Sequence, residues 1–221
     1  MVKTLGIHTA GLGCSVAVLD GDRLLSVRHI EAVRGQAEVL MPMTLDALAE
    51  AGVALKSIYR FGVTIGPGSF TGVRIGLAAV RGMMMATGRP GVGVTSFEAA
   101  AHGIPDAEID GRLLLVTVES KRAELFVQSF DSRRDPIGEA EALSPEQIAE
   151  RYGSREIAIL GDGAFRLKPI LLGRPNVRFS DRASPEAVAV ARLAASRSTS
   201  GPPPRPVYFR PPDVTVLSQP R

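Results

Sequence analysis

The sequence is poor in cysteine, aromatic residues and long apolar runs, and each shortage excludes a class of protein. Among its 221 residues are a single cysteine, Cys14, no tryptophan and three histidines, and 5% of the residues are aromatic. One cysteine excludes an internal disulfide framework and fits a reducing compartment. No secretory signal begins the chain, and no apolar run approaches the ~20 residues that a membrane-spanning helix needs. We therefore expect a cytoplasmic protein with no membrane partner.

Charge is unevenly distributed along the chain. The net charge is +3, but the segment 166–221 holds ten Lys or Arg against three Asp or Glu. A basic end of this kind is typical of a surface for RNA or for an acidic protein, or else of a solvated, Pro-rich tail. No aromatic residues interleave with the charges in the manner of a base-stacking surface, so we favour the tail.

Apolar periodicity predicts an α/β chain in which one order of elements occurs twice. In the first half we expect strands at 5–9, 15–19 and 24–30, then a helix at 36–51 and a strand at 59–65. A helix at 73–87 and a short strand at 91–94 follow. The second half repeats the order less cleanly, at 112–118, 124–130, 137–143, a helix after Ser144, 156–160, 164–172 and 185–196. Two βββαβα halves predict a duplicated fold with a cleft between them. We place the halves at 1–103 and 104–221, the first with the long helices and the second with the basic, Pro-rich tail.

The most informative stretch is a glycine-rich turn between a strand and a helix. Gly66 and Pro67 end the strand, and Ser69 or Thr71 can cap the helix that follows. Such a turn can attract anions at the helix N-terminus, but the lysine of a Walker motif is absent. We interpret the turn as architectural. Its residues are Gly66, Pro67, Gly68, Ser69, Phe70 and Thr71.

The helix after this turn is apolar nearly all round. Over 73–87 its only charges are Arg74 and Arg81. Its own sheet covers one flank, and a chain of this length has little to cover the other, which predicts a protein interface. Together with the helix at 36–51, we expect this interface to contain Val39, Leu40, Met43, Gly72, Val73, Gly76, Leu77, Val80 and Met84.

No group in the sequence has the neighbours that catalysis needs. Cys14 lies in an apolar alternation with no readable histidine partner, which favours a packing thiol over a nucleophile. His102 stands alone, and we interpret it as a surface or helix-end residue rather than a metal ligand. No Gly-x-Ser-x-Gly elbow of a serine hydrolase is present. We expect no catalytic residues, no metal and no cofactor.

The long motif at 66–76, Gly-Pro-Gly-Ser-Phe-Thr-Gly-Val-Arg-Ile-Gly, resembles the hallmark of the TsaB (YeaZ) family. Looser similarity extends to 7–18, 119–126, 161–163 and 208–210, so it covers nearly the whole chain. The resemblance implies an ASKHA (actin/hexokinase-like) fold of two RNase-H-like halves. It also implies a non-catalytic subunit of the bacterial machinery that makes threonylcarbamoyl-adenosine in tRNA.

Two sites of chemistry known from related proteins are altered here. In the catalytic relative, TsaD, a His-x-x-x-His pair holds a metal, and the matching positions are Ser96 and Ala100, which are poor ligands. Most family members keep an acid on the first strand, where this chain has His8, a poor ligand for Mg²⁺. We interpret His8 as structural rather than as a general base.

The resemblance implies a scaffold and activator. Its expected partners are a TsaD-like catalytic subunit and a TsaE-like ATPase, with a homodimer when alone, and with tRNA reached only through the complex. Two alternatives stay open: an independent ASKHA-type ATPase or kinase that uses the cleft, and an RNA-binding module that acts through 166–221.

Overall fold

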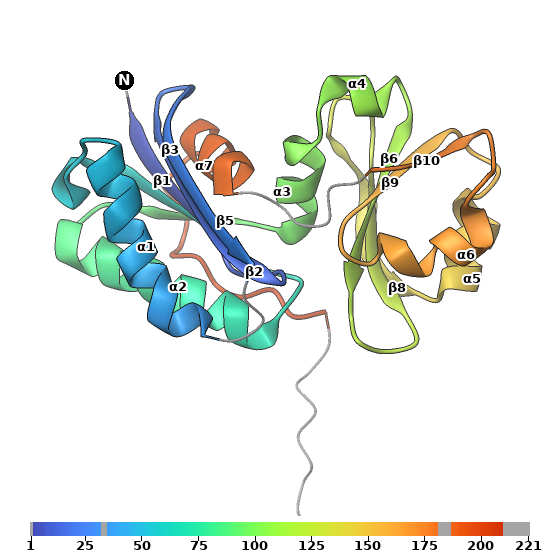
Figure 1. The fold of residues 1–221 in the computed structure, drawn as a ribbon, viewed down its shortest axis with the longest axis horizontal. Coiled ribbons are helices and arrows are strands. Elements are labelled where there is room, and N and C mark those ends of the chain that lie inside the picture. The colour runs from blue at the N-terminus through green and yellow to red at the C-terminus, as the bar shows by residue number, and fades with distance from the viewer. Residues whose placement is uncertain (1, 32–34, 181–186, 210–221) are drawn as a thin grey trace, which may run out of the picture.

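The computed structural model describes residues 2–31, 35–180 and 187–209 of the chain. It forms two α/β halves that lie side by side, each built on one five-stranded sheet (Figure 1). None of the helices in these ranges is long and apolar enough to cross a lipid bilayer.

The first sheet has the strand order β3-β2-β1-β4-β5. β1 pairs antiparallel with β2 and parallel with β4, so the sheet is mixed. The three strands of the opening meander match the predicted ones within two residues at each end. The bounds are β1 Lys3–His8, β2 Gly13–Asp20, β3 Arg23–Glu31, β4 Arg60–Thr64 and β5 Gly91–Val94.

The second sheet repeats the first. Its order, read from the β8 edge, is β8-β7-β6-β9-β10. As in the first sheet, two antiparallel pairs are followed by two parallel pairs. The predicted duplication is confirmed, including the short strand expected at 91–94 in the first half, and the second half gains a fifth strand as well. The last strand, β10, was not predicted because three residues are too few to show a period. The bounds are β6 Leu113–Glu119, β7 Leu125–Phe130, β8 Pro136–Leu143, β9 Ile157–Leu160 and β10 Val177–Phe179.

Three helices, α2, α3 and α5, begin at Ser or Thr residues that cap them. The Ser69 hydroxyl accepts the Gly72 N–H at 3.1 Å, and Ser144 forms a capping box with Gln147. The helix predicted at 164–172 is shorter, a 3₁₀ turn followed by a single α turn. The bounds are α1 Gln36–Glu50, α2 Phe70–Thr87, α3 Ser96–Gly103, α4 Asp106–Ile109, α5 Pro145–Tyr152, α6 Lys168–Leu171 and α7 Ala187–Ser196, with 3₁₀ turns at Leu55–Ser57 and Ala164–Arg166.

The last helix of each half packs on the sheet of the other half. α7 lies on the face of the first sheet opposite α1 and α2, while α3 lies on the second sheet (Figure 1). Glycines let α7 approach closely, because a Cβ on Gly6 would lie 2.4 Å from the Ala187 carbonyl oxygen. The division at residue 103 stays a prediction, and both α3 and α7 cross between the halves.

A short segment after α7, residues 204–209, packs against both halves. We call it the strap. The Val207 N–H donates to the Ile65 carbonyl oxygen at 2.8 Å, beside the glycine-rich turn. The Phe209 ring lies 5.8 Å from that of Phe97 on α3 and 5.4 Å from that of Phe126 on β7. The strap therefore contacts both halves, as an extended docked segment.

Candidate functional site

The glycine-rich turn is locked onto the end of β1. The Ser69 N–H donates to the Ala10 carbonyl oxygen at 2.7 Å. Gly68 has a φ of 147°, and a Cβ there would lie 2.3 Å from the same oxygen, so only glycine fits this approach. These contacts are internal to the chain, and they agree with an architectural role for the turn.

Gly72 and Gly76 form a surface against which Thr9 packs. A Cβ on Gly72 would lie 1.9 Å from the Thr9 carbonyl oxygen, and one on Gly76 would lie 2.4 Å from the Thr9 hydroxyl. The Thr9 hydroxyl also donates to the Gly72 carbonyl oxygen at 2.7 Å. The space beside these two glycines is therefore filled by the chain's own residue Thr9, which directly follows β1. The prediction that both glycines lie at a protein interface is therefore corrected, because each is buried against this residue.

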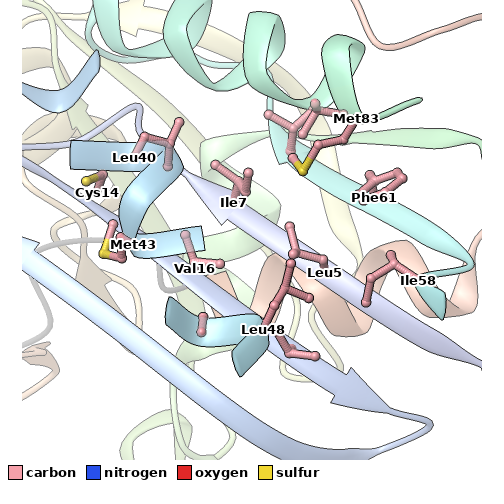
Figure 2. Packing of buried hydrophobic residues seen from close by; sticks show 14 of the residues in the cluster. Leu5, Ile7, Cys14, Val16, Leu40, Met43, Leu48, Ile58, Phe61 and Met83 are labelled. Carbon is pink, nitrogen blue, oxygen red and sulfur yellow. The ribbon is translucent and has the colours of Figure 1, made fainter. Parts of the chain in front are cut away.

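Most of the other residues expected at the interface are also buried inside the chain. Figure 2 shows Leu40 and Met43 of α1 directed toward the strands rather than toward solvent. In α2, sequence periodicity could not tell the sheet-facing side from the outer side, because apolar residues lie on both. Val39 and Met84 alone of the set are partly exposed. The buried members, at most 9% exposed, are Leu40, Met43, Gly72, Val73, Gly76, Leu77 and Val80.

A different set of apolar residues faces outward on the same two helices. Leu45 is 58% exposed on α1, and Met85 is 87% exposed on α2. Met41 and Ala78 are exposed beside them. We call these four residues the outer helix face. The interface on α1 and α2 stays a prediction, and this face offers the large apolar side chains that are most exposed on these two helices.

A cavity of about 470 Å³ lies between the two halves. The β1–β2 turn and the start of α2 form one wall, and the loops after β6 and β9 form the other. Its polar lining includes Glu119, Lys121 and Asp162, and its apolar lining includes three aromatic rings. Those rings belong to Phe70, Phe126 and Phe165. The sequence predicted a cleft here, but it marked the turn residues of this wall, at 68–71, as architectural rather than as residues of the cleft.

His8 and Asp162 line a narrow extension of this cavity. The His8 Nδ1 lies 2.9 Å from the Thr64 hydroxyl, and the Nε2 has no hydrogen-bond partner among the described residues. Burial, with a smaller effect of His29, lowers the pKa of His8 to about 4, so the ring is neutral at pH 7. Burial raises the pKa of Asp162 to about 6, although its Oδ1 accepts the Glu119 N–H at 2.8 Å.

The residues present do not fit a metal site. Ser96 donates its hydroxyl to the Pro67 carbonyl oxygen at 2.5 Å, so this side chain holds α3 to the glycine-rich turn. Ala100 has no donor atom. Across 2–31, 35–180 and 187–209, no group of three His, Cys, Asp or Glu side chains is placed to hold an ion. Cys14 is fully buried, and burial raises the pKa of its thiol, which opposes a nucleophilic role.

Several cations of the basic C-terminal quarter are tied into the structure. Arg166 pairs with Glu119 at 3.2 Å and also donates to the Arg122 carbonyl oxygen at 2.7 Å. Arg178 pairs with Asp110 at 3.3 Å. These guanidinium groups fasten loops of the second half. Residues 181–186 and 210–221 of the basic quarter lie outside the described residues.

The two sheets of identical order, with α3 and α7 packed crosswise and a cleft between the halves, define an ASKHA-like protein. The model of the family described as TsaD, tRNA N6-adenosine threonylcarbamoyltransferase, matches residues 30–196. The chain belongs to this family and, within it, to the TsaB/YeaZ group. The expectation drawn from the motif at 66–76 is confirmed.

Named relatives support that assignment. The tRNA threonylcarbamoyladenosine biosynthesis protein TsaB of Haemophilus influenzae is 28% identical over 202 residues, covering 86% of this chain and 84% of the relative. TsaB of Escherichia coli K12 is 29% identical over 154 residues, covering 68% of this chain and 66% of the relative. The solved structure of YeaZ from Pseudomonas aeruginosa superimposes with a TM-score of 0.72 at 25% identity, covering 88% of this chain and 91% of that chain.

Proposed function

We propose that this protein is a non-catalytic subunit that acts with a TsaD-like catalytic subunit in the threonylcarbamoylation of adenosine in tRNA. The observation that carries the proposal is the outer helix face, Met41, Leu45, Ala78 and Met85, which exposes apolar side chains on the two longest helices. Membership in the TsaB/YeaZ group supplies the reaction, because relatives in this group are named for threonylcarbamoyladenosine biosynthesis.

The chemistry of the cleft supports a non-catalytic role. Ser96 and Ala100 replace the metal-binding histidines of the catalytic relative, and Ser96 is already used in packing. His8 replaces the acid that would position Mg²⁺, and its low pKa keeps it neutral. A neutral imidazole is a poor ligand for a hard cation.

The outer helix face supports helix-on-helix pairing. Exposed apolar residues on two neighbouring helices form a surface that a partner's helices can cover. A specific complex buries on the order of 1,600 Å² in total. In the proposal this face binds the TsaD-like subunit, and the same face supports a homodimer when the partner is absent. The pair then recruits a TsaE-like ATPase and reaches tRNA as a complex.

The test is co-elution of this chain with the catalytic subunit from the same organism. Met85→Asp and Leu45→Asp place a charge on the outer helix face, and we expect each variant to stay folded and to lose co-elution. Leu172→Asp is the matched control, because Leu172 is 69% exposed but lies in the second half. Val80→Asp is unsuitable, since Val80 is 0% exposed and the charge would unfold the chain. Retained co-elution of both outer-face variants contradicts the proposal.

The rival function is an independent ATPase or kinase that uses the cleft. Calorimetric titration of the isolated chain with Mg-ATP separates the two. We expect no strong binding, and binding in the low micromolar range favours the rival instead.

A further inference from the structure

Four exposed apolar side chains surround the mouth of the inter-half cavity. They come from the β1–β2 turn, the start of α2, the 3₁₀ turn after β9, and the strap. Each is a large side chain that an isolated monomer has little reason to expose at the edge of one hollow. We call them the cleft rim: Leu12 at 57%, Phe70 at 41%, Phe165 at 61% and Tyr208 at 42% exposure.

Cations lie next to these rings. The Arg74 guanidinium stands 3.7 Å from the centre of the Phe70 ring, and its Nε donates to the Tyr208 hydroxyl at 3.1 Å. Lys121 is exposed and lines the cavity, and Arg122 follows it at the exposed tip of the same loop. The interleaving of rings and positive charges that the sequence lacks is therefore created by the fold.

The cavity below the rim has the opposite character. Its floor carries the carboxyl groups of Glu119 and Asp162, and the unpartnered Nε2 of His8 lies in the extension beneath. Carboxylate oxygens accept hydrogen bonds and repel phosphate, and of the two carboxylates that of Glu119 is already paired with Arg166 at 3.2 Å, so the Asp162 group is the one that favours a donor from a ligand. A ligand that fits both the rim and the cavity has its negative charge at the rim. It places a flat group with N–H donors in the cavity.

We propose that the cleft rim binds a single-stranded segment of RNA, with one base inserted between Phe70, Phe126 and Phe165 and its phosphates on Lys121, Arg122 and Arg74. Aromatic platforms beside positive charge are the physical basis of single-strand binding. The floor predicts a preference for a base with an exocyclic amino group. The inference rests on the proposed function for the identity of the RNA, a tRNA loop, and extends it by giving this chain a direct RNA contact.

The test uses the isolated full chain and two fluorescein-labelled RNA probes, a cytidine 12-mer and a uridine 12-mer, in fluorescence anisotropy. The two bases have the same ring size. Cytosine has an amino group at C4 and an acceptor at N3, whereas uracil has a carbonyl at C4 and a single N–H donor at N3. We expect the cytidine probe to bind several-fold more tightly than the uridine probe. Phe165→Ala should weaken binding about 10-fold, since stacking on one ring contributes about 1–3 kcal/mol.

A second variant reports on the phosphate contacts. Lys121→Gln should reduce the slope of log K against log salt by about 0.7, the value for one phosphate contact on a single strand. The matched control is Tyr59→Ala, because Tyr59 forms an exposed ring–cation pair with Arg89 at 4.5 Å, beside the opposite end of β1. Thermal melts confirm that each variant is folded.

Three outcomes overturn the inference. One is binding that Phe165→Ala and Tyr59→Ala weaken equally. Another is that millimolar AMP displaces the RNA probe and that the 12-mers bind no more tightly than AMP does. This result assigns the cavity to a free nucleotide. The third is unchanged RNA binding by Phe165→Ala together with lost co-elution with the catalytic subunit, which assigns the rim to a protein segment. The first two outcomes leave the proposed function intact. The third also counts against the outer helix face as the partner site, which the Leu45→Asp and Met85→Asp variants test separately.

Discussion

The two halves share one strand order but differ in the helices that cover their sheets. On the first sheet, α1 and α2 have 15 and 18 residues, whereas the corresponding α5 and α6 have 8 and 4. Short helices suffice to bury one face of a small sheet. The additional turns of α1 and α2 leave Leu45 and Met85 exposed. The difference is that the first half exposes large apolar side chains on long helices, which is the surface that the proposed function uses, whereas the helices of the second half are short.

The crossed helices α3 and α7 also pack by different means. α7 is rich in alanine and lies against Gly6 and Gly62, where a Cβ would come within 2.8 Å of α7 atoms. α3 instead inserts the fully buried Phe97 into the core of the second half. The first contact depends on the absence of side chains and the second on a large ring. The two should therefore respond differently to added volume.

The largest expected effect is at the glycine contact. In Gly6→Val, the new side chain meets backbone atoms of α7 at Ala187 that cannot move aside without displacing the helix. We expect a loss of about 3 kcal/mol or more in the free energy of unfolding, because overpacking against backbone has no rotamer that relieves it. Urea unfolding followed by circular dichroism measures this. A loss below about 1 kcal/mol would show that α7 is loosely held and that the halves are not interlocked.

The next largest effect comes from the ionisation of Asp162, which the second half contributes to the cavity. The pKa of Asp162 rises from 3.8 to about 6 on folding, so between these values the folded chain binds a proton that the unfolded chain has released. The stability that this group contributes is full below pH 3.8 and is lost as pH rises through 6. Asp162→Asn keeps an oxygen acceptor for the Glu119 N–H and should gain on the order of 2 kcal/mol over the parent chain at pH 7.

The first half contributes a group of opposite sign to the same cavity, and it serves as the control. The pKa of His8 falls from 6.5 to about 4, so its contribution is full above pH 6.5 and is lost as pH falls through 4. The free energy of unfolding should therefore decrease less between pH 7 and pH 4 in His8→Gln than in the parent chain. In Asp162→Asn it should decrease more. Paired urea titrations at the two pH values check both signs. Equal shifts in the two variants would contradict the assignment of the groups.

Much of the fold follows from local patterns in the sequence, but the surfaces do not. The alternation in β2 and the serine before α5 are local signals, and both elements lie where these signals place them. The apolar character of α2 was equally clear, yet Val80 and Met85 look alike in sequence and differ from 0% to 87% in exposure. Which side of a helix meets the sheet depends on long-range packing. Sequence periodicity alone could not supply that information.

The cavity wall was beyond prediction for a related reason. Phe70 begins α2, Lys121 lies in the loop after β6, and Phe165 lies in the 3₁₀ turn after β9, so three segments far apart in the sequence form one wall because the two halves pack together. A signal was present in the resemblance at 119–126 and 161–163, which marks both loops of the second half. It gave no indication of what the loops would face.

The strap allows the comparison of the halves to be sharpened, because Phe209 contacts α3 and β7 at once. Phe209→Ala removes a partly buried ring, and we expect it to lower the free energy of unfolding by about 1–2 kcal/mol, less than a fully buried phenylalanine costs. Tyr208→Phe is the control, since it removes only the hydroxyl that accepts from Arg74. Differential scanning calorimetry should show a lower melting temperature for the first variant alone. An unchanged melting temperature would mean that the strap does not join the halves.

The smallest expected effect separates the two roles of α2. Gly82 is exposed within the helix, and a Cβ there meets nothing within 4 Å, unlike one on Gly72 or Gly76. Gly82→Ala should therefore raise the free energy of unfolding of the isolated chain by about 0.5–1 kcal/mol through helix propensity. If the partner's helix approaches α2 as closely as Thr9 does on the inner side, the same methyl group should weaken co-elution with the catalytic subunit. A variant that is stabilised and still co-elutes fully would show that the partner does not approach the backbone of α2 closely at Gly82, which lies between Ala78 and Met85 on the outer helix face.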